Sequence, residues 1–125
     1  MKKKIKPGVI WITGLSGAGK TTLSKILYKK LKINYSNIKL LDGDVLRKKL
    51  NIKNKKSFTY NSRKKVGIKF SKICREYEKK NFLVIIAVMV LIEDVQTWNE
   101  KNLKNYLDIY LKVPLYILKK RILMN

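Results

Sequence analysis

The residues best suited to chemistry in this sequence form one run near its start, Gly14-Leu15-Ser16-Gly17-Ala18-Gly19-Lys20-Thr21. This run matches the phosphate-binding pattern G-x-x-x-x-G-K-[ST] at every fixed position. Its glycines let the backbone adopt unusual dihedral angles and bring N–H groups close to phosphate oxygens. We expect Lys20 to reach the β- and γ-phosphates of a nucleoside triphosphate, and the Thr21 hydroxyl to bind the Mg²⁺ that bridges them. The alternative is a glycine-rich turn that contains an unrelated lysine.

The neighbouring elements decide between these readings, because a phosphate loop joins a strand to a helix. Val9-Ile10-Trp11-Ile12 is a compact apolar run, as in a strand buried within a parallel sheet. Beyond the loop, apolar residues recur at helical spacing, at Leu23, Ile26, Leu27 and Leu31. A strand and a helix are therefore predicted on the two sides. Residues 14–22, Thr22 included, are predicted to bind the nucleotide.

Two acidic residues, Asp42 and Asp44, form the second candidate group. They directly follow Ile38-Lys39-Leu40-Leu41, which predicts a short strand. Ligands of a parallel α/β sheet bind beyond the carboxyl ends of its strands, so both carboxylates are expected to face the nucleotide. Either of them could then bind Mg²⁺, directly or through water. Asp44 could instead serve only as the N-cap of a short helix predicted over residues 45–50.

The later part of the chain predicts the elements that complete the fold. Apolar residues at helical spacing indicate a helix over residues 62–81, and the continuously apolar residues 82–90 indicate a strand buried on both faces. A helix over residues 93–105 comes next. In residues 107–113 the apolar side chains alternate from Leu107 onward, which indicates a strand with one exposed face. This order predicts a single three-layer α/β domain with a mostly parallel sheet.

Two further segments complete this outline. Residues 51–61 are polar, lysine-rich and aperiodic, which predicts a loop over the site of the second substrate. The aromatic residues Phe58 and Tyr60 could stack there on a base, or could simply tether the loop to the core. Pro114 is expected to begin a last helix.

Composition limits the class of protein. The chain has 125 residues, of which 46% are hydrophobic, so a single globular domain is expected. The longest apolar run, residues 82–92, is shorter than the roughly 18 residues that span a bilayer, so no membrane helix is predicted. The basic start leads straight into the phosphate loop, which indicates a cytoplasmic protein rather than a signal peptide. With one cysteine, Cys74, and no histidine, neither an internal disulfide nor a Cys/His metal cluster is possible, and Cys74 is expected to be a core residue.

The formal charge of +22, from 30 Lys and Arg against 8 Asp and Glu, is the unusual global property. Such an excess is typical of nucleic-acid-binding proteins. The lysines, however, are spread along the chain and form no stripe interleaved with aromatic residues. We favour a general bias toward Lys, Asn and Ile, which produces a basic surface that attracts anionic nucleotides. No specific nucleic-acid partner is predicted, although a basic nucleic-acid binder is an alternative.

Three stretches together resemble the adenylylsulfate kinase family: residues 14–22, Leu41-Asp42-Gly43-Asp44-Val45-Leu46-Arg47, and Tyr110-Leu111-Lys112-Val113-Pro114 with Lys120-Arg121 beyond it. That family has a P-loop NTPase fold and transfers the γ-phosphate of ATP to the 3′-hydroxyl of adenosine 5′-phosphosulfate, in sulfate assimilation. The resemblance implies ATP and Mg²⁺ as cofactors, a nucleotide acceptor and a homodimer.

The resemblance also assigns roles to individual residues. It implies that Asp44 activates the acceptor hydroxyl or positions Mg²⁺ through water, that Asp42 is its companion on the Mg²⁺ side, and that Lys20 acts on the transferred phosphate. Arg47 would contact the phosphate of the acceptor, a task that suits a bidentate guanidinium. The alternative for Arg47 is a solvated charge on an exposed helix.

Two signatures of the family are altered here. In place of its Asp-Arg-x-x-Asn signature the chain has Thr59-Tyr60-Asn61-Ser62-Arg63, so Asn61 and Arg63 are expected to bind the acceptor but stand at a different spacing. In place of Ile-Ser-Pro it has Met89-Val90-Leu91. The region around Trp98-Asn99 resembles a kinase-like branch associated with surface-polysaccharide modification, some members of which phosphorylate cytidine diphosphoramidate.

The C-terminal part of the family pattern is the third departure. Family members continue beyond the position of Arg121 into a Leu-Tyr-x-x-Ala lid over ATP, whereas this sequence ends at Asn125. We therefore expect the C-terminal lid and the last strand to be missing. Three functions follow as hypotheses: an adenylylsulfate kinase, a cytidine diphosphoramidate kinase or other small P-loop kinase, and an ATP-binding fragment without activity.

Overall fold

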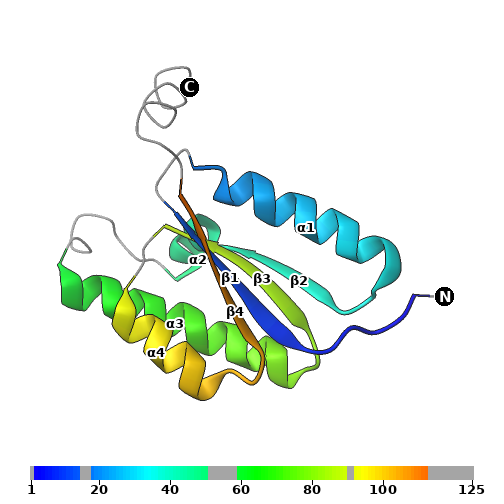
Figure 1. Ribbon diagram of the computed structural model, residues 1–125. Coiled ribbons are helices and arrows are strands. Elements are labelled where there is room, and N and C mark those ends of the chain that lie inside the picture. The colour runs from blue at the N-terminus through cyan, green and yellow to red at the C-terminus, as the bar shows by residue number, and fades with distance from the viewer. Residues whose placement is uncertain (1, 15–17, 51–58, 90–91, 113–125) are drawn as a thin grey trace.

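Helices cover both faces of a parallel sheet in the computed structural model, which describes residues 2–14, 18–50, 59–89 and 92–112 (Figure 1). In chain order the elements are β1 (Gly8–Gly14), α1 (Lys20–Asn34), β2 (Ile38–Asp42), α2 (Gly43–Lys49), α3 (Tyr60–Lys79), β3 (Leu83–Val88), α4 (Glu93–Asn102) and β4 (Tyr106–Leu111). The described strands lie in the order β2-β3-β1-β4 and are all parallel. The predicted three-layer α/β fold with a parallel sheet is confirmed.

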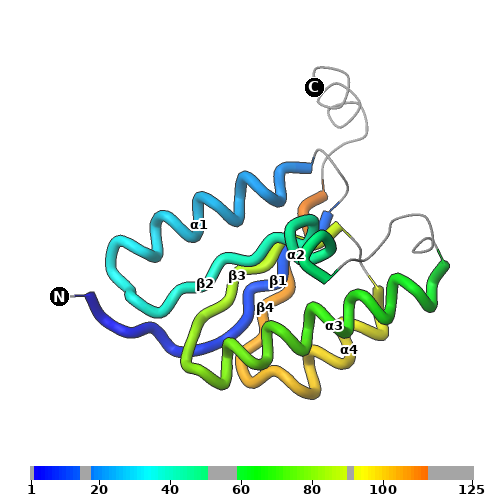
Figure 2. The backbone as a smooth tube through the Cα atoms, turned by 180° about the vertical axis from the view of Figure 1, so that it is seen from behind, coloured from blue at the N-terminus to red at the C-terminus, as the bar shows by residue number. Residues whose placement is uncertain are grey.

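The direction of the strands decides where a ligand can bind. β1 and β3 lie in the middle of the sheet, and every residue of β3 is buried, as its continuous apolar run predicts. Because the strands are parallel, their carboxyl ends meet at one edge, on the left in Figure 1. The N-terminal turns of α1, α3 and α4 lie at the same edge, together with α2 (Figures 1 and 2). Helix N-termini and strand ends thus converge on one side of the molecule.

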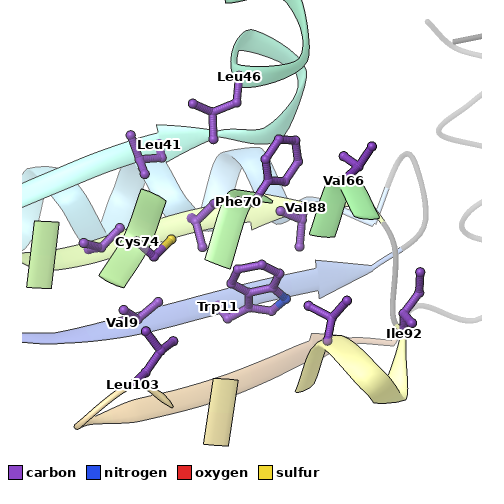
Figure 3. Packing of buried hydrophobic residues seen from close by; sticks show 13 residues of the cluster. Val9, Trp11, Leu41, Leu46, Val66, Phe70, Cys74, Val88, Ile92 and Leu103 are labelled. Carbon is purple, nitrogen blue, oxygen red and sulfur yellow. The ribbon is translucent and has the colours of Figure 1, made fainter. Parts of the chain in front are cut away.

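Two hydrophobic clusters hold the three layers together. One lies between the sheet and the pair α3 and α4, and includes Trp11, Phe70 and Cys74 (Figure 3). The other lies between the sheet and α1, with Ile12 and Ile85 fully buried. Burial raises the pKa of the Cys74 thiol, which keeps it protonated. Cys74 is therefore a core residue, as predicted.

Buried polar side chains tie the connections at the opposite edge of the sheet. The side chain of Asn37 accepts a hydrogen bond from the backbone N–H of Ile5 and donates one to its carbonyl oxygen, each at 2.8 Å. The carboxylate of Glu78 accepts from the backbone N–H groups of Lys104 and Asn105 at 3.0 and 3.3 Å. Buried polar atoms with partners are stabilising rather than costly. The edge remote from the site is therefore held by specific side chains.

The start of α3 differs from the prediction. The helix begins at Tyr60 rather than Ser62, because Thr59 is its N-cap and its hydroxyl oxygen accepts from the backbone N–H of Ser62 at 3.2 Å. Tyr60 and Asn61 are therefore helical and not part of a loop. Residues 51–58 of the predicted loop, Phe58 included, lie outside the described residues.

The edge strand β4 also differs in detail. Leu107 belongs to the apolar face that the alternation predicts to be covered, but it is 54% exposed on this edge strand. On the face toward α4, the Gln96 amide donates to the carboxylate of Asp108. Burial raises the pKa of the nearby Tyr106 hydroxyl to about 12, and the charge of Asp108 adds to the effect. The helix predicted to begin at Pro114 lies outside the described residues.

A membrane-spanning helix was not predicted from the sequence. Within the described ranges, no helix combines the length and the apolar character needed to cross a bilayer.

Candidate active site

The phosphate loop begins at the buried end of β1. A side chain at Gly14 would bring its Cβ to 3.1 Å from the carbonyl oxygen of Leu111 on β4, so a larger residue would crowd the neighbouring strand. Gly19 has φ 95° and ψ 16°, a left-handed conformation that glycine adopts without strain. Helix α1 begins directly after it, at Lys20. Leu15, Ser16 and Gly17 lie outside the described residues, and Ala18 is buried.

The N-terminus of α1 is open toward the pocket. It has no side-chain cap and no acidic residue in its first turn. The partial positive charge of a helix N-terminus favours an anion when no carboxylate competes. Lys20 is half-buried, Thr21 and Thr22 are exposed, and the Ser24 hydroxyl donates to the carbonyl oxygen of Thr21 at 2.8 Å. The residues present therefore fit a bound phosphate.

The acidic pair lies at the junction of β2 and α2. Asp42 Oδ1 accepts from the backbone N–H groups of Asp44 and Val45, at 2.9 and 3.3 Å. The N-cap of α2 is therefore Asp42 and not Asp44, because α2 begins at Gly43, two residues earlier than predicted. This capping leaves the Asp44 side chain exposed in the first turn of α2. Gly43 packs closely against β3, since a Cβ there would lie 3.0 Å from the carbonyl oxygen of Ala87.

One pocket brings these groups together with two arginines. Its polar lining comes from α1, from the junction of β2 and α2, and from α3: Lys20, Thr21, Asp42, Asp44, Arg47 and Arg63. Thr22 and Asn61 are not part of this lining, and Asn61 is exposed on the first turn of α3. Cationic groups and carboxylates that line one pocket can hold anionic ligands together with a divalent cation.

The match to a family profile decides the assignment. A family model of adenylylsulphate kinases matches residues 6–123 of this chain. The chain belongs to the adenylylsulphate kinase family. It is therefore a P-loop kinase by family, in agreement with the loop, the sheet and the acidic pair described above.

Two curated relatives and one solved structure illustrate the range of this kinase family. The chain is 35% identical over 118 residues to the cytidine diphosphoramidate kinase of Campylobacter jejuni. This match covers 94% of this chain and 68% of the relative. It is also 35% identical over 118 residues to a probable adenylyl-sulfate kinase of Archaeoglobus fulgidus, covering 90% and 72%. A Mycobacterium tuberculosis APS kinase in complex with AMPPNP and APS superposes with a TM-score of 0.81 at 22% identity, covering 93% and 68%, which supports the fold.

The apolar wall of the kinase pocket was not predicted as part of the site. It is formed mainly by the inner faces of α3 and α4 and the ends of β1 and β3: Trp11, Val66, Gly67, Phe70, Ala87, Val88, Met89, Ile92 and Val95. The sequence analysis assigned Val66 and Phe70 only to the core face of a helix. A signal was present, because Arg63 precedes them at helical spacing and so shares their face.

Metal binding in this kinase would need few protein ligands. The described residues contain no group of three or more His, Cys, Asp and Glu side chains that could hold a metal ion. Mg²⁺ in kinases keeps several waters and takes only one or two protein ligands beside the phosphates. Thr21, Asp42 and Asp44, which share the pocket, fit this limited donor set.

Several expectations about this kinase stay predictions. They are the cytoplasmic location, the homodimer and the lack of a specific nucleic-acid partner. The expected loss of the lid and the last strand concerns the chain after residue 112, which lies outside the described residues. Val90 and Leu91 of the altered Ile-Ser-Pro signature also lie outside them.

Proposed function

We propose that this protein binds ATP with Mg²⁺ at its phosphate loop and transfers the γ-phosphate to a hydroxyl group of a nucleotide acceptor. The observation that carries the proposal is the shared pocket, in which Lys20 and Thr21 of α1 face the same space as Asp44 and Arg47 of α2 and Arg63 of α3. Phosphoryl transfer asks a protein mainly to align two substrates and to neutralise phosphate charge. This lining has groups for both tasks.

The donor side is assigned to the loop and the first turn of α1. The backbone N–H groups after Gly19 and the ammonium group of Lys20 hold the phosphates of ATP, and the Thr21 hydroxyl is a ligand of Mg²⁺. The cation supplies charge neutralisation between the phosphates. Leu15, Ser16, Gly17 and Thr22 complete the predicted binding loop.

The acidic pair divides its work between chemistry and position. Asp44 is exposed on the pocket, so its carboxylate can accept the proton of the acceptor hydroxyl. Asp42 Oδ1 already accepts two backbone N–H groups, so a contact to a Mg²⁺-bound water falls to Oδ2. One of those N–H groups belongs to Asp44. Asp42 therefore also fixes the position of the catalytic carboxylate.

The acceptor is an anion held by the arginines. Arg47 and Arg63 line the pocket from α2 and α3, and a guanidinium can bind a phosphate or sulfate oxygen pair in bidentate fashion. Asn61 stands outside this lining, and its contact with the acceptor stays a prediction.

Two acceptors are candidates, and a specific observation favours each. Adenosine 5′-phosphosulfate is favoured by the family match over residues 6–123 and by the relative from Archaeoglobus fulgidus. Cytidine diphosphoramidate is favoured by the relative from Campylobacter jejuni and by the resemblance around Trp98-Asn99, whereas the altered signatures at residues 59–63 and 89–91 count against an unchanged site for adenosine 5′-phosphosulfate. Both acceptors carry a negatively charged phosphate-containing linkage, which the guanidinium groups of two arginines can bind.

The test is a transfer assay with ATP labelled at the γ-phosphate and each acceptor separately. We expect label in one product and a loss of at least about 100-fold in the Lys20→Ala variant, because the charge that neutralises the transferred phosphate is removed. Lys25→Ala, at an exposed lysine of the same helix, is the matched control and should keep full activity. Binding of MgATP without transfer to either acceptor would contradict the kinase proposal and support a nucleotide-binding protein.

A further inference from the structure

A cluster of three side chains joins the first turns of α3 and α4 beside the pocket. The Tyr60 hydroxyl donates to Asp94 Oδ2 at 2.7 Å, and Lys64 Nζ lies 3.3 Å from the same oxygen. Tyr60 and Lys64 are one turn apart on α3, and Asp94 is in the first turn of α4. We call these three residues the clasp. It links two helices whose inner faces form the apolar wall of the pocket.

The clasp shares its helical turns with pocket residues. Arg63 lies between Tyr60 and Lys64 in the sequence and lines the pocket, and Ile92 and Val95, on either side of Asp94 in the sequence, line the same pocket. One turn further along α3, Gly67 packs so closely on α4 that an added Cβ would lie 2.7 Å from Val95 Cγ2. The clasp therefore joins α3 and α4 at their first turns, and the contact between Gly67 and Val95 joins them one turn further along α3.

We propose that the clasp is a positioning device for the acceptor: by holding the first turn of α3 against α4, it fixes where Arg63 enters the pocket. This inference rests on the proposed function. The clasp touches neither the phosphate loop nor α2 through any of the contacts described. Its removal therefore affects the acceptor side and leaves ATP binding unchanged.

The contrast with a second surface ion pair on α3 supports a specific role. Lys79 and Glu76 lie 3.7 Å apart near the C-terminal end, join residues of a single helix, and are 55% and 66% exposed. Such pairs contribute little. The bond from Tyr60 to Asp94 instead joins residues 34 positions apart and is a charge-assisted hydrogen bond. The pair at residues 76 and 79 is therefore a matched control.

The pKa values of Asp94 and Tyr60 keep the clasp intact around neutral pH. The hydrogen bond from Tyr60 and then the ammonium group of Lys64 hold the pKa of Asp94 below its ordinary value. The same bond raises the pKa of Tyr60, with help from burial and from the charges of Asp94 and Glu93. No other described titratable group contributes to either shift. Around neutral pH the carboxylate is thus charged and the phenol protonated.

The main experiment measures kinetics of Tyr60→Phe, which removes one hydroxyl and keeps the ring. We expect KM for the acceptor to rise about three- to fivefold, with kcat and KM for ATP unchanged, as for the loss of one partly solvated hydrogen bond to a charge. Lys79→Met should change none of these values. Equal changes in the two KM values, or no change in either, would overturn the proposal.

A second measurement does not depend on activity. Amide hydrogen exchange of the ligand-free protein should become faster at residues 61–64 in Tyr60→Phe and stay unchanged in Lys79→Met, because the first turn of α3 loses its tether. Unchanged exchange in Tyr60→Phe would overturn the clasp itself. Faster exchange in a protein that phosphorylates neither acceptor would support the clasp and reject the proposed function.

Discussion

The proposed donor and acceptor halves of the pocket are built in different ways. The donor half comes from one continuous stretch, in which β1 ends at Gly14 and α1 begins at Lys20. The acceptor half is assembled from α2, α3 and α4, and its groups are spread from Asp42 to Val95 in the sequence. Backbone geometry dominates the first half, and the packing of helices dominates the second.

This difference explains why the kinase family of the chain is clear whereas the identity of its acceptor is not. A phosphate loop needs glycines and a helix N-terminus in one order, so few changes are tolerated there. An acceptor wall on helices can change side chains while the fold is kept. Two relatives equally identical to this chain, at 35%, bear the names of different kinases. The predictions below each act on one half and should leave the other unchanged.

The largest effect is expected for Asp44→Asn. Transfer should fall about 100-fold or more, because the amide cannot accept a proton, whereas MgATP affinity should change little. Stability should stay within about 0.5 kcal/mol, since the cap of α2 is Asp42. Steady-state kinetics, calorimetry and thermal unfolding measure the three quantities.

Asp42→Asn is the matched control for that variant. Asparagine caps helices as well as aspartate, so α2 should keep its stability and the fall in transfer should be smaller. Equal losses in the two variants would contradict the division of work between the two carboxylates.

Gly19→Ala should act on the donor half. The left-handed φ of 95° costs a residue with a side chain about 1–2 kcal/mol, and relaxing it moves the N–H groups that meet the phosphates. We expect weaker ATP binding and unchanged acceptor binding, both read by calorimetry. A loss of acceptor binding of the same size would mean that the two halves are not separable.

Gly67→Ala should act on the acceptor half. The added Cβ would lie 2.7 Å from Val95 Cγ2, and overpacking of this kind costs about 1–3 kcal/mol. The better helix propensity of alanine offsets about 1 kcal/mol of that cost. We expect a net destabilisation in chemical denaturation, and a raised KM for the acceptor only. Adding Val95→Ala should relieve the clash, because it removes the two methyl groups nearest the new Cβ, but should recover only part of the stability, because Val95 is itself buried.

The smallest effect is that of pH on the clasp. The folded pKa of Asp94 lies below its ordinary 3.8, so its contribution is complete above that value and is lost as pH falls through the folded pKa. The pKa of Tyr60 is raised above 10.0, so its hydrogen bond is lost only as pH rises through that higher value. Acceptor affinity should therefore show no clasp-dependent change between these limits. In pH profiles of wild type and Tyr60→Phe, the ratio of the two acceptor KM values should therefore stay constant across this plateau, and a ratio that changes with pH there would contradict the prediction.

Most of the fold could be predicted because its signals are local. The apolar run at residues 9–12, the fully apolar β3 and the helical spacing in α1 and α3 each identify an element without knowledge of its neighbours. The errors fall at element ends. Thr59 starts α3 earlier than the apolar pattern does, because a cap acts through a side-chain oxygen and not through hydrophobic periodicity.

The candidate site was predictable to a lesser degree. Lys20, Thr21, Asp42, Asp44, Arg47 and Arg63 were all chosen from the sequence and line one pocket, whereas Asn61 does not. Gly67 and Val95 were missed as site residues. Their close contact joins residues from two helices separated by β3, and no local pattern reports such a distance.

The sequence by itself determined the phosphate loop, the order of strands and helices and the kinase family, because glycine positions and apolar periodicity act over a few residues. Only the tertiary structure decided that Asp42 rather than Asp44 caps α2, that Arg47 and Arg63 line one pocket with Lys20 and Thr21, and that Tyr60 is bonded to Asp94. These relations depend on how helices from distant parts of the chain pack on one parallel sheet. Packing of that kind is set by side-chain volume and close contact, which the linear order of residues does not display.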